Sequence, residues 1–298
     1  MEDTGHPGTG TSEDPGPQPA ISVVLPVRNG MPWIRDQLDA LSHQDVEGTW
    51  EVVVVDNGST DDTVQFVESW MVGHESVQLV DGAALPGAAA ARNAGAHAAT
   101  GAILAFCDAD DVVETDWLTA IASALDRFDV VSGVADVWSL QGRERGDRAP
   151  VTSINPFEFL PHAGSRNLAM RRSTFDAVDG FDPTFLTHED VDLSWRLQLR
   201  GFTLGTADDA VVAVRYREGF AATFRQRFRY GRFAPALYAR YRSAGMAWSP
   251  AEAVKSWAWI VCSAPLLVQE SRRLWWAQNA GLRLGRLVGS IDQRVLFF

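Results

Sequence analysis

The stretch EVVVVDNGSTDDT, residues 51–63, decides how the fold is built. Its four consecutive valines form a β-branched apolar run, which is typical of a strand covered on both faces. The polar residues behind the valines favour a turn and supply capping side chains for a helix. Val64, Val67 and Met71 then follow at helical spacing. The stretch therefore predicts one strand–turn–helix unit.

Similar units lie on both sides of this stretch. Buried strands are predicted at 21–27 (ISVVLPV), 77–80 (VQLV), 102–107 (AILAFC) and 129–138 (DVVSGVADVW), with an alanine-rich helix at 87–100. Alternating strands and helices joined by short turns predict an α/β fold with a parallel, doubly wound sheet. Ligands of such sheets bind outside the carboxyl ends of the strands.

Three of these strands end in segments that carry polar residues and are expected at one edge of the sheet. They are Pro26 to Asn29, Asp56, and the run Asp108 to Asp111. Like charges as close as the three aspartates of this run repel one another. The candidate explanations are open solvent, a helix cap and a bound cation.

Charge is distributed unevenly along the chain. The net charge of −12 argues against a nucleic-acid partner, because phosphate contacts need basic surface. Residues 215–298 nevertheless hold 14 lysines and arginines against 4 aspartates and glutamates. This basic, Trp-rich region, expected to be helical, either meets an anionic membrane surface or phosphorylated lipid, or packs on the acidic body.

The remaining bulk features indicate a cytoplasmic protein. Two distant cysteines, Cys107 and Cys262, do not make a disulfide framework and fit a reducing compartment. Residues 1–19 are rich in Gly, Pro and acid, so we expect a disordered tail and no signal peptide. No apolar stretch reaches the ~20 residues that a spanning helix needs.

Asp108 and Asp110 are candidate metal ligands. Carboxylates separated by one residue at a strand end can offer oxygens to one Mg²⁺ or Mn²⁺, which could neutralise a leaving diphosphate. An isolated Asp-x-Asp is more often a solvated turn or helix cap. Asp111 is the best candidate for capping the next helix.

Two further side chains could bind a nucleotide. Asp56 could accept the imide N–H of a uracil or thymine base, a donor that cytosine lacks. Its alternative is a solvated aspartate at a strand end. Arg92 could reach a diphosphate bidentately, or could be a plain surface arginine.

Four segments in order resemble the nucleotide-sugar glycosyltransferases of family 2. They are ISVVLPVRNG (21–30), EVVVVDNGSTDDT (51–63), LPGAAAARNAGAHAATGAILAFCDADD (85–111) and HEDVDLSWRLQLRGF (188–202). The resemblance covers roughly residues 20 to 205. It implies a Rossmann-like GT-A fold, a nucleoside-diphosphate sugar donor, Mg²⁺ or Mn²⁺, and inversion at the anomeric carbon.

The resemblance carries residue roles onto this chain. The residues matching donor-binding positions are Pro26, Arg28, Asp56, Arg92 and Asp108. Asp108 and Asp110 match the metal-linked pair, with Asp110 as the direct ligand and Asp108 nearer the ribose. Asn57 departs from the commoner second aspartate, at a position less directly involved.

The catalytic candidates are Asp190 and Glu189. Inversion needs a general base that removes the proton of the acceptor hydroxyl. The family pattern favours Asp190 as this base, while Glu189 orients it or holds the acceptor. The alternative is that both acids only cap a helix beginning near residue 189, in which Asp192 pairs with Arg196.

The region after residue 214 carries a partial signature of processive family members. Gln226, Arg229 and Tyr230 resemble Gln-x-x-Arg-Trp, with Tyr in place of Trp. This segment either closes over the substrates or serves helix packing. Without the transmembrane helices of such synthases, processive extrusion is not expected.

Together these observations predict three segments and one activity. The segments are a tail at 1–19, a GT-A domain at 20–214 and a helical extension at 215–298. The activity is metal-dependent, non-processive transfer from a UDP- or dTDP-sugar to a lipid-linked or polysaccharide acceptor of the cell envelope, at the inner membrane face. The alternatives are a nucleotidyltransferase and a catalytically silent nucleotide-binding scaffold.

Overall fold

The computed structural model describes residues 20–142, 149–150, 157, 159–215, 219–265 and 269–297. The predicted tail at 1–19 lies outside these residues. The strands are β1 (Ile21–Val27), β2 (Trp50–Asp56), β3 (Val77–Asp81), β4 (Ile103–Cys107), β5 (Val112–Val113), β6 (Val130–Asp136), β7 (Ala149–Pro150), β8 (Asn167–Arg171) and β9 (Leu204–Ala213). The helices are α1 (Ile34–Ser42), α2 (Thr63–Met71), α3 (Ala88–Ala98), α4 (Trp117–Leu125), α5 (Arg172–Asp176), α6 (Glu189–Leu199), α7 (Phe220–Tyr241), α8 (Pro250–Ser263) and α9 (Glu270–Gln293).

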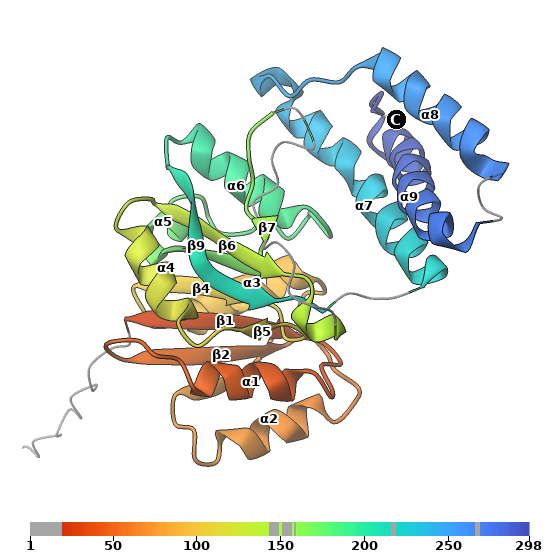
Figure 1. The fold of residues 1–298 in the computed structure, drawn as a ribbon. Helices are drawn as coiled ribbons and strands as arrows, with labels where there is room; N and C mark the ends of the chain where they lie inside the picture. Colours follow the sequence, from red (N-terminus) through yellow and green to blue (C-terminus); the bar gives the residue numbers. More distant parts are fainter. Residues whose placement is uncertain are drawn as a thin grey trace, which may run out of the picture.

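One sheet forms the body of the molecule (Figure 1), in the order β3-β2-β1-β4-β8-β6-β9-β5, with β7 beside β6. Strands β3, β2, β1 and β4 are parallel, as the valine runs predict. Strand β8 runs antiparallel between β4 and β6, and the sequence reading did not include it. The predicted α/β fold with C-terminal helices is confirmed.

Helices cover both faces of the sheet. Side chains of α1, α2 and α4 pack on one face, where Trp117 is fully buried. Helices α3, α5 and α6 cover the other face. The alanine-rich α3 lies close to the sheet, because a Cβ at Gly95 would come within 2.5 Å of Val24. This close approach brings Arg92, one turn earlier in α3, near the strand ends.

The C-terminal helices form a separate layer beside α6 (Figure 1). Helices α7 and α9 are in backbone contact, since a Cβ at Gly285 of α9 would overlap the carbonyl oxygen of Phe228 in α7. Trp195 of α6 packs against Leu237 and Tyr241 of α7. None of the helices in the described ranges has the length and apolar composition of a transmembrane segment.

Candidate active site

An acidic cluster lies directly behind β4. The carboxylates of Asp108, Asp110 and Asp111 each place an oxygen within 4.8 Å of the others. Buried Gln37 pins this turn, donating to the Asp108 carbonyl (3.2 Å) and accepting from the Val113 amide (3.0 Å). Three carboxylates at this spacing form the hard oxygen set that Mg²⁺ and Mn²⁺ prefer, so the residues fit a divalent cation.

Asp111 belongs to this cluster, and the expectation that it caps the next helix is wrong. The next helix, α4, begins at Trp117, whereas Asp111 is buried and accepts the amide of Arg215 at 2.9 Å. Arg166 forms an ion pair with its other oxygen at 3.7 Å. Burial, together with the negative charge of Asp108, raises the pKa of Asp111 to about 7.

Arg92 joins the acidic cluster to the first turn of α6. Its guanidinium donates to Asp108 at 2.9 Å and to Glu189 at 2.8 Å, and only 4% of its surface is exposed. Burial opposes its charge, but Asp108 and Glu189 outweigh this effect and raise the pKa of Arg92. Arg92 is therefore no surface arginine: it holds Glu189 and Asp108 together across the site.

Asp190 lies next to Glu189 and is half-buried. Its carboxylate accepts the amides of Ser165 (3.2 Å) and Val191 (2.9 Å). His188 precedes the helix with a left-handed φ of 66°, and its ring lies 5.7 Å from that of Tyr230. Burial lowers the pKa of His188 to about 4, although Asp190 opposes this shift. A neutral imidazole thus lies beside Asp190 at neutral pH.

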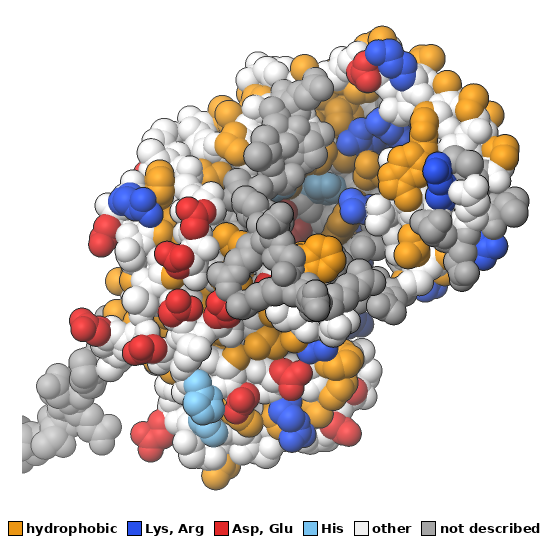
Figure 2. All heavy atoms as spheres, viewed as in Figure 1, with side chains coloured by type: hydrophobic (Ala, Val, Ile, Leu, Met, Phe, Trp, Pro, Cys, Tyr) orange, Lys and Arg blue, Asp and Glu red, His pale blue; other side chains and the backbone are white. Residues whose placement is uncertain are grey.

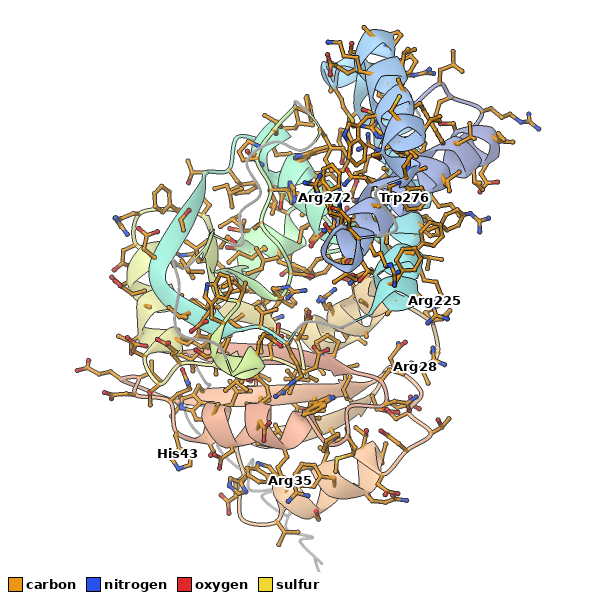
Figure 3. All side chains as sticks on the ribbon, turned by 45° about the vertical axis from the view of Figure 1, so that its right-hand side comes forward. Arg28, Arg35, His43, Arg225, Arg272 and Trp276 are labelled. Atoms are coloured by element: carbon orange, nitrogen blue, oxygen red, sulfur yellow. The ribbon has the colours of Figure 1, made fainter. Side chains whose placement is uncertain are left out.

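The donor-side candidates lie at the ends of β1 and β2. The strand register pairs Pro26 with Val55, and Val27 with Asp56. The Asp56 carboxylate accepts the amides of Gly58 (3.2 Å) and Ser59 (3.1 Å) in its own turn. Arg28 is exposed just beyond β1, on the side where Arg225 of α7 also lies (Figure 3). Pro26, Arg28 and Asp56 therefore share one edge of the sheet.

Comparison with known proteins identifies the family. The model of glycosyl transferase family 2 matches residues 22–183, more than half of the chain. The chain belongs to glycosyl transferase family 2. A second model, glycosyl transferase family group 2, matches residues 103–282 and so extends into α9. Membership of the family supports glycosyl transfer over the nucleotidyltransferase and scaffold alternatives.

Curated relatives are also glycosyltransferases. AglE of Haloferax volcanii is 27% identical over 223 residues, covering 72% of this chain and 72% of AglE. The pre-mycofactocin glycosyltransferase of Mycobacterium tuberculosis is 26% identical over 287 residues, covering 91% of this chain. The chain spans only 55% of that relative's length.

Solved structures share the fold, which confirms the expected GT-A architecture. Mannosyltransferase PcManGT from Pyrobaculum calidifontis, in complex with GDP-Man and Mn²⁺, has a TM-score of 0.65 at 22% identity, covering 94% of this chain and 89% of that one. S. aureus TarS 1-349 in complex with UDP-GlcNAc has a TM-score of 0.52 at 19% identity, covering 93% of each chain.

Asn57 has a larger role in this glycosyltransferase than its departure from the family pattern indicated. Its side-chain amide donates to the carbonyls of Gly82 (2.9 Å) and Leu85 (3.1 Å). Its oxygen accepts the amide of Gly87 at 3.2 Å. Asn57 thereby ties the loop before α3 to the end of β2, beside Asp56. An aspartate could not make the two donor bonds.

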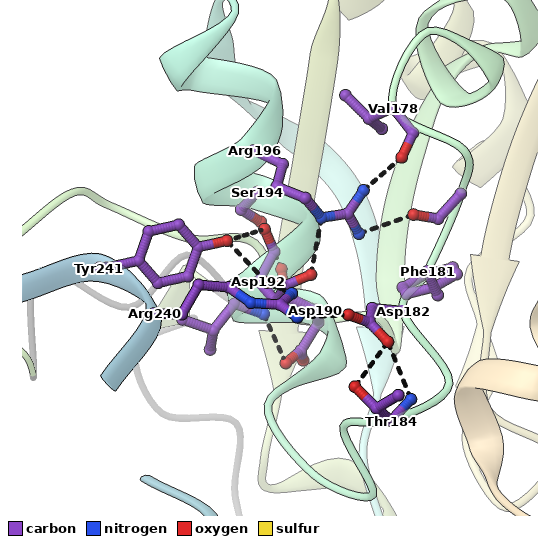
Figure 4. A network of polar contacts seen from close by, with 12 residues as sticks. Val178, Phe181, Asp182, Thr184, Asp190, Asp192, Ser194, Arg196, Arg240 and Tyr241 are labelled. Carbon is purple, nitrogen blue, oxygen red and sulfur yellow. Dashed lines mark hydrogen bonds and ion pairs between the residues drawn. The ribbon is translucent and has the colours of Figure 1, made fainter. Parts of the chain in front are cut away.

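Asp192 links helix α6 to α7 (Figure 4). The predicted pair with Arg196 is confirmed at 2.7 Å. The same buried carboxylate also accepts from Arg240 (2.8 Å) and from the hydroxyl of Tyr241 (2.6 Å). Arg240 forms a second ion pair, with Asp182, at 2.7 Å. These contacts fix the end of α7 against α6.

Sequence reasoning missed several residues around the candidate site. His162 is buried, and burial lowers its pKa although Asp190 opposes the shift. Arg166 and Arg215 hold Asp111 from two other segments. In the sequence these three residues are recognisable only as polar residues between apolar segments. That pattern does not indicate which side chains they contact. Tyr230 was named in the sequence as part of the partial Gln-x-x-Arg-Trp signature, and its ring lies against that of His188.

Proposed function

We propose that this glycosyltransferase moves a sugar from a UDP- or dTDP-sugar to an acceptor hydroxyl, with inversion at the anomeric carbon. The observation that carries the proposal is that Arg92 bridges Asp108 and Glu189, and that Asp190 directly follows Glu189 in α6. This arrangement joins the acidic cluster to a half-buried carboxylate beside it. A donor diphosphate and an acceptor hydroxyl need these two features within one site.

On the donor side, Asp56 accepts the imide N–H of the base, which uracil and thymine carry and cytosine lacks. Pro26 and Arg28 lie against the nucleoside, and Asp108 lies near the ribose. The neighbouring structures of TarS with UDP-GlcNAc and PcManGT with GDP-Man are consistent with a nucleotide-sugar donor. A carboxylate at Asp56 argues against a cytosine nucleotide, and we propose UDP or dTDP as the donor nucleotide.

Asp110, together with Asp108, would hold Mg²⁺ or Mn²⁺. Such an ion, when bound, neutralises charge on the diphosphate leaving group. Asp111 Oδ2 forms an ion pair with Arg166 but accepts no hydrogen bond from any residue in the described ranges, and Asp111 would be a further ligand for the same ion. Arg92 holds Asp108 in place and keeps part of the cluster's charge balanced before the donor arrives.

On the acceptor side, Asp190 acts as the general base. It takes the hydroxyl proton while the acceptor oxygen forms its bond to the anomeric carbon. The bond from that carbon to the diphosphate oxygen breaks, and its electron pair leaves with the diphosphate. Glu189 is held by Arg92 and positions Asp190. Neutral His188 places no positive charge beside Asp190 at neutral pH.

We further propose a lipid-linked or polysaccharide acceptor, met in a single transfer at the inner face of the cell membrane. Support comes from α8, where Val254 and Val261 are 65% and 70% exposed, and from Trp275 of α9, which is 47% exposed. Apolar side chains on a basic helical layer suit a surface of anionic lipids. Helices α7 to α9 would carry this contact.

A donor panel tests the activity. The protein is mixed with Mn²⁺ and UDP-, dTDP- or GDP-sugars, and stabilisation against thermal unfolding identifies the bound donor. Asp190→Asn should keep this stabilisation and lose transfer, while Asp110→Ala should lose the Mn²⁺-dependent part of donor binding. Full transfer by Asp190→Asn would remove Asp190 as the base, and unchanged Mn²⁺ titrations of Asp110→Ala would remove the metal role.

A further inference from the structure

For Arg286 of α9, the described part of the chain supplies no acid that balances its charge. Its Nε is buried, and within the described ranges no atom accepts a hydrogen bond from it and no acid forms an ion pair with it. Its guanidinium stacks on Phe297 at 4.9 Å. Burial, then the positive charge of Arg283, lower the pKa of Arg286 to about 10. An arginine that remains charged in such a place is costly unless an anion joins it.

Arg283 does not relieve this imbalance. Burial lowers its own pKa, opposed by Glu252 of α8. Glu252 is already paired with Lys255 at 2.6 Å. Two arginines one turn apart on α9 therefore share a poorly solvated environment with little acid. Because a guanidinium presents a planar fork of donors, this pair matches the geometry of a phosphate or carboxylate.

The packing of α9 on α7 places Arg286 near His188, the residue before Glu189 and Asp190. A Cβ at Gly231 of α7 would lie 2.9 Å from the backbone nitrogen of Arg286. The preceding residue, Tyr230, contacts the His188 ring. His188 in turn lies within electrostatic range of both Asp190 and Arg286. Figure 2 shows the molecule hollowed between the sheet and the C-terminal helices, with histidine and basic side chains in the wall of the hollow.

Arg286 lies on the acceptor side of this site. Arg92 interacts with Asp108, Glu189 and Asp190, and so occupies the side of the acidic cluster. Arg286 acts instead on His188, which lies just before these acids in the chain and faces α7. A ligand group held by Arg286 would therefore lie on the side of His188 and Tyr230, whereas Arg92 contacts Asp108 of the acidic cluster.

We propose that Arg286, supported by Arg283, binds a phosphate or carboxylate of the acceptor while Asp190 faces the acceptor's hydroxyl. This inference rests on the proposed function, because it takes Asp190 as the general base that contacts the acceptor hydroxyl. It adds a substrate class: the acceptor is an anion. A lipid phosphate, a phosphorylated glycan and an acidic sugar all carry such a group.

Calorimetric titration tests the proposal with the full chain saturated with UDP and Mn²⁺, so that the donor side is filled. The probes are decyl phosphate below its micelle concentration, inorganic phosphate and glucuronate, with decyl glucoside as the uncharged control. We expect at least one anion to bind, and Arg286→Gln to weaken it tenfold or more. Binding of decyl phosphate alone identifies a lipid phosphate, binding of both phosphates a bare phosphate group, and binding of glucuronate an acidic sugar.

The matched control is Arg272→Gln, an exposed position on the same helix. It lies 14 residues from Arg286, or about 21 Å along the axis. It should leave anion binding within twofold. Thermal unfolding checks the fold of each variant, and Arg283→Gln replaces Arg286→Gln if the latter does not fold.

Three results would overturn the proposal: no anion binds, the arginine variants bind as tightly as the parent, or UDP displaces the anion, which would place it on the donor side. Failure of the proposed function is visible separately. UDP and dTDP binding are titrated first, and the absence of both would refute the donor assignment. The anion titration without UDP would still report on Arg286.

Discussion

Asp192→Asn should destabilise the folded protein strongly, because Asp192 is fully buried and joins two helices. Its carboxylate accepts from Arg196, Arg240 and Tyr241 at 2.7, 2.8 and 2.6 Å. The asparagine keeps one acceptor oxygen, but its amide group turns a donor toward these donors and leaves Arg196 without its anion, while Arg240 keeps only Asp182. Removing one partner of such a buried pair costs about 3–5 kcal/mol in the free energy of unfolding.

The matched control is Asp292→Asn, the same substitution in the exposed Arg232–Asp292 pair at 2.9 Å. Both side chains of this pair are at least 41% exposed. An exposed pair contributes about 0–1 kcal/mol, so this variant should stay near the parent protein.

Urea unfolding followed by tryptophan fluorescence measures both variants, with the slope of the transition compared to confirm that the same surface unfolds. Tyr241→Phe isolates one of the three bonds and should cost about 1–3 kcal/mol. A loss below about 1 kcal/mol for Asp192→Asn, equal to that of the exposed control, would refute the view that this carboxylate holds α7 on α6.

Three further substitutions test other parts of the molecule. Arg92→Gln leaves two facing carboxylates unbalanced and should cost about 3–5 kcal/mol in urea unfolding; a change under 1 kcal/mol would contradict the bridge. His188→Asn keeps a residue that tolerates the left-handed backbone. Because His188 titrates near pH 4 when folded and near 6.5 when unfolded, it costs stability as pH falls through this window. Between pH 7 and pH 4 the free energy of unfolding should therefore fall by up to roughly 3 kcal/mol less in the variant than in the parent. If the two proteins lose stability in parallel over this range, the lowered pKa of His188 is excluded. Val254→Glu with Val261→Glu should release the protein from anionic vesicles in flotation, and unchanged flotation would remove α8 as the contact.

The parallel half of the sheet could be predicted because local signals agree there. Each valine-rich strand is buried on both faces, so its pattern needs no knowledge of distant residues. Strand β8 gave no such signal: NLAMR is short, and its place between β4 and β6 depends on segments far away in the chain. Helix α6 was expected near residue 189, since acids suit a helix start.

The residues of the candidate site could be named from the sequence, but the contacts between them could not. Arg92 and Glu189 are 97 positions apart, and no local pattern shows that they form a pair. Asp111 was misjudged for the same reason, because its partner is the Arg215 amide 104 positions away. The α7–α9 contact did have a signal in the glycines at 281, 285 and 289, four residues apart, which place small residues on one helix face.

The glycine contact between α7 and α9 has a consequence for engineering. Each helix fits the backbone of the other too closely for a methyl group at Gly231 or Gly285. A chimaera that exchanged α9 alone would therefore set unrelated side chains against this backbone. Exchanging α7 to α9 together would keep the matched surfaces of α7 and α9. Arg240 and Tyr241 would have to be retained in the exchanged α7, because they contact Asp192 of α6. The sheet and the acidic cluster behind β4 would then stay untouched, so the exchange would test the proposed contact of α7 to α9 with the acceptor.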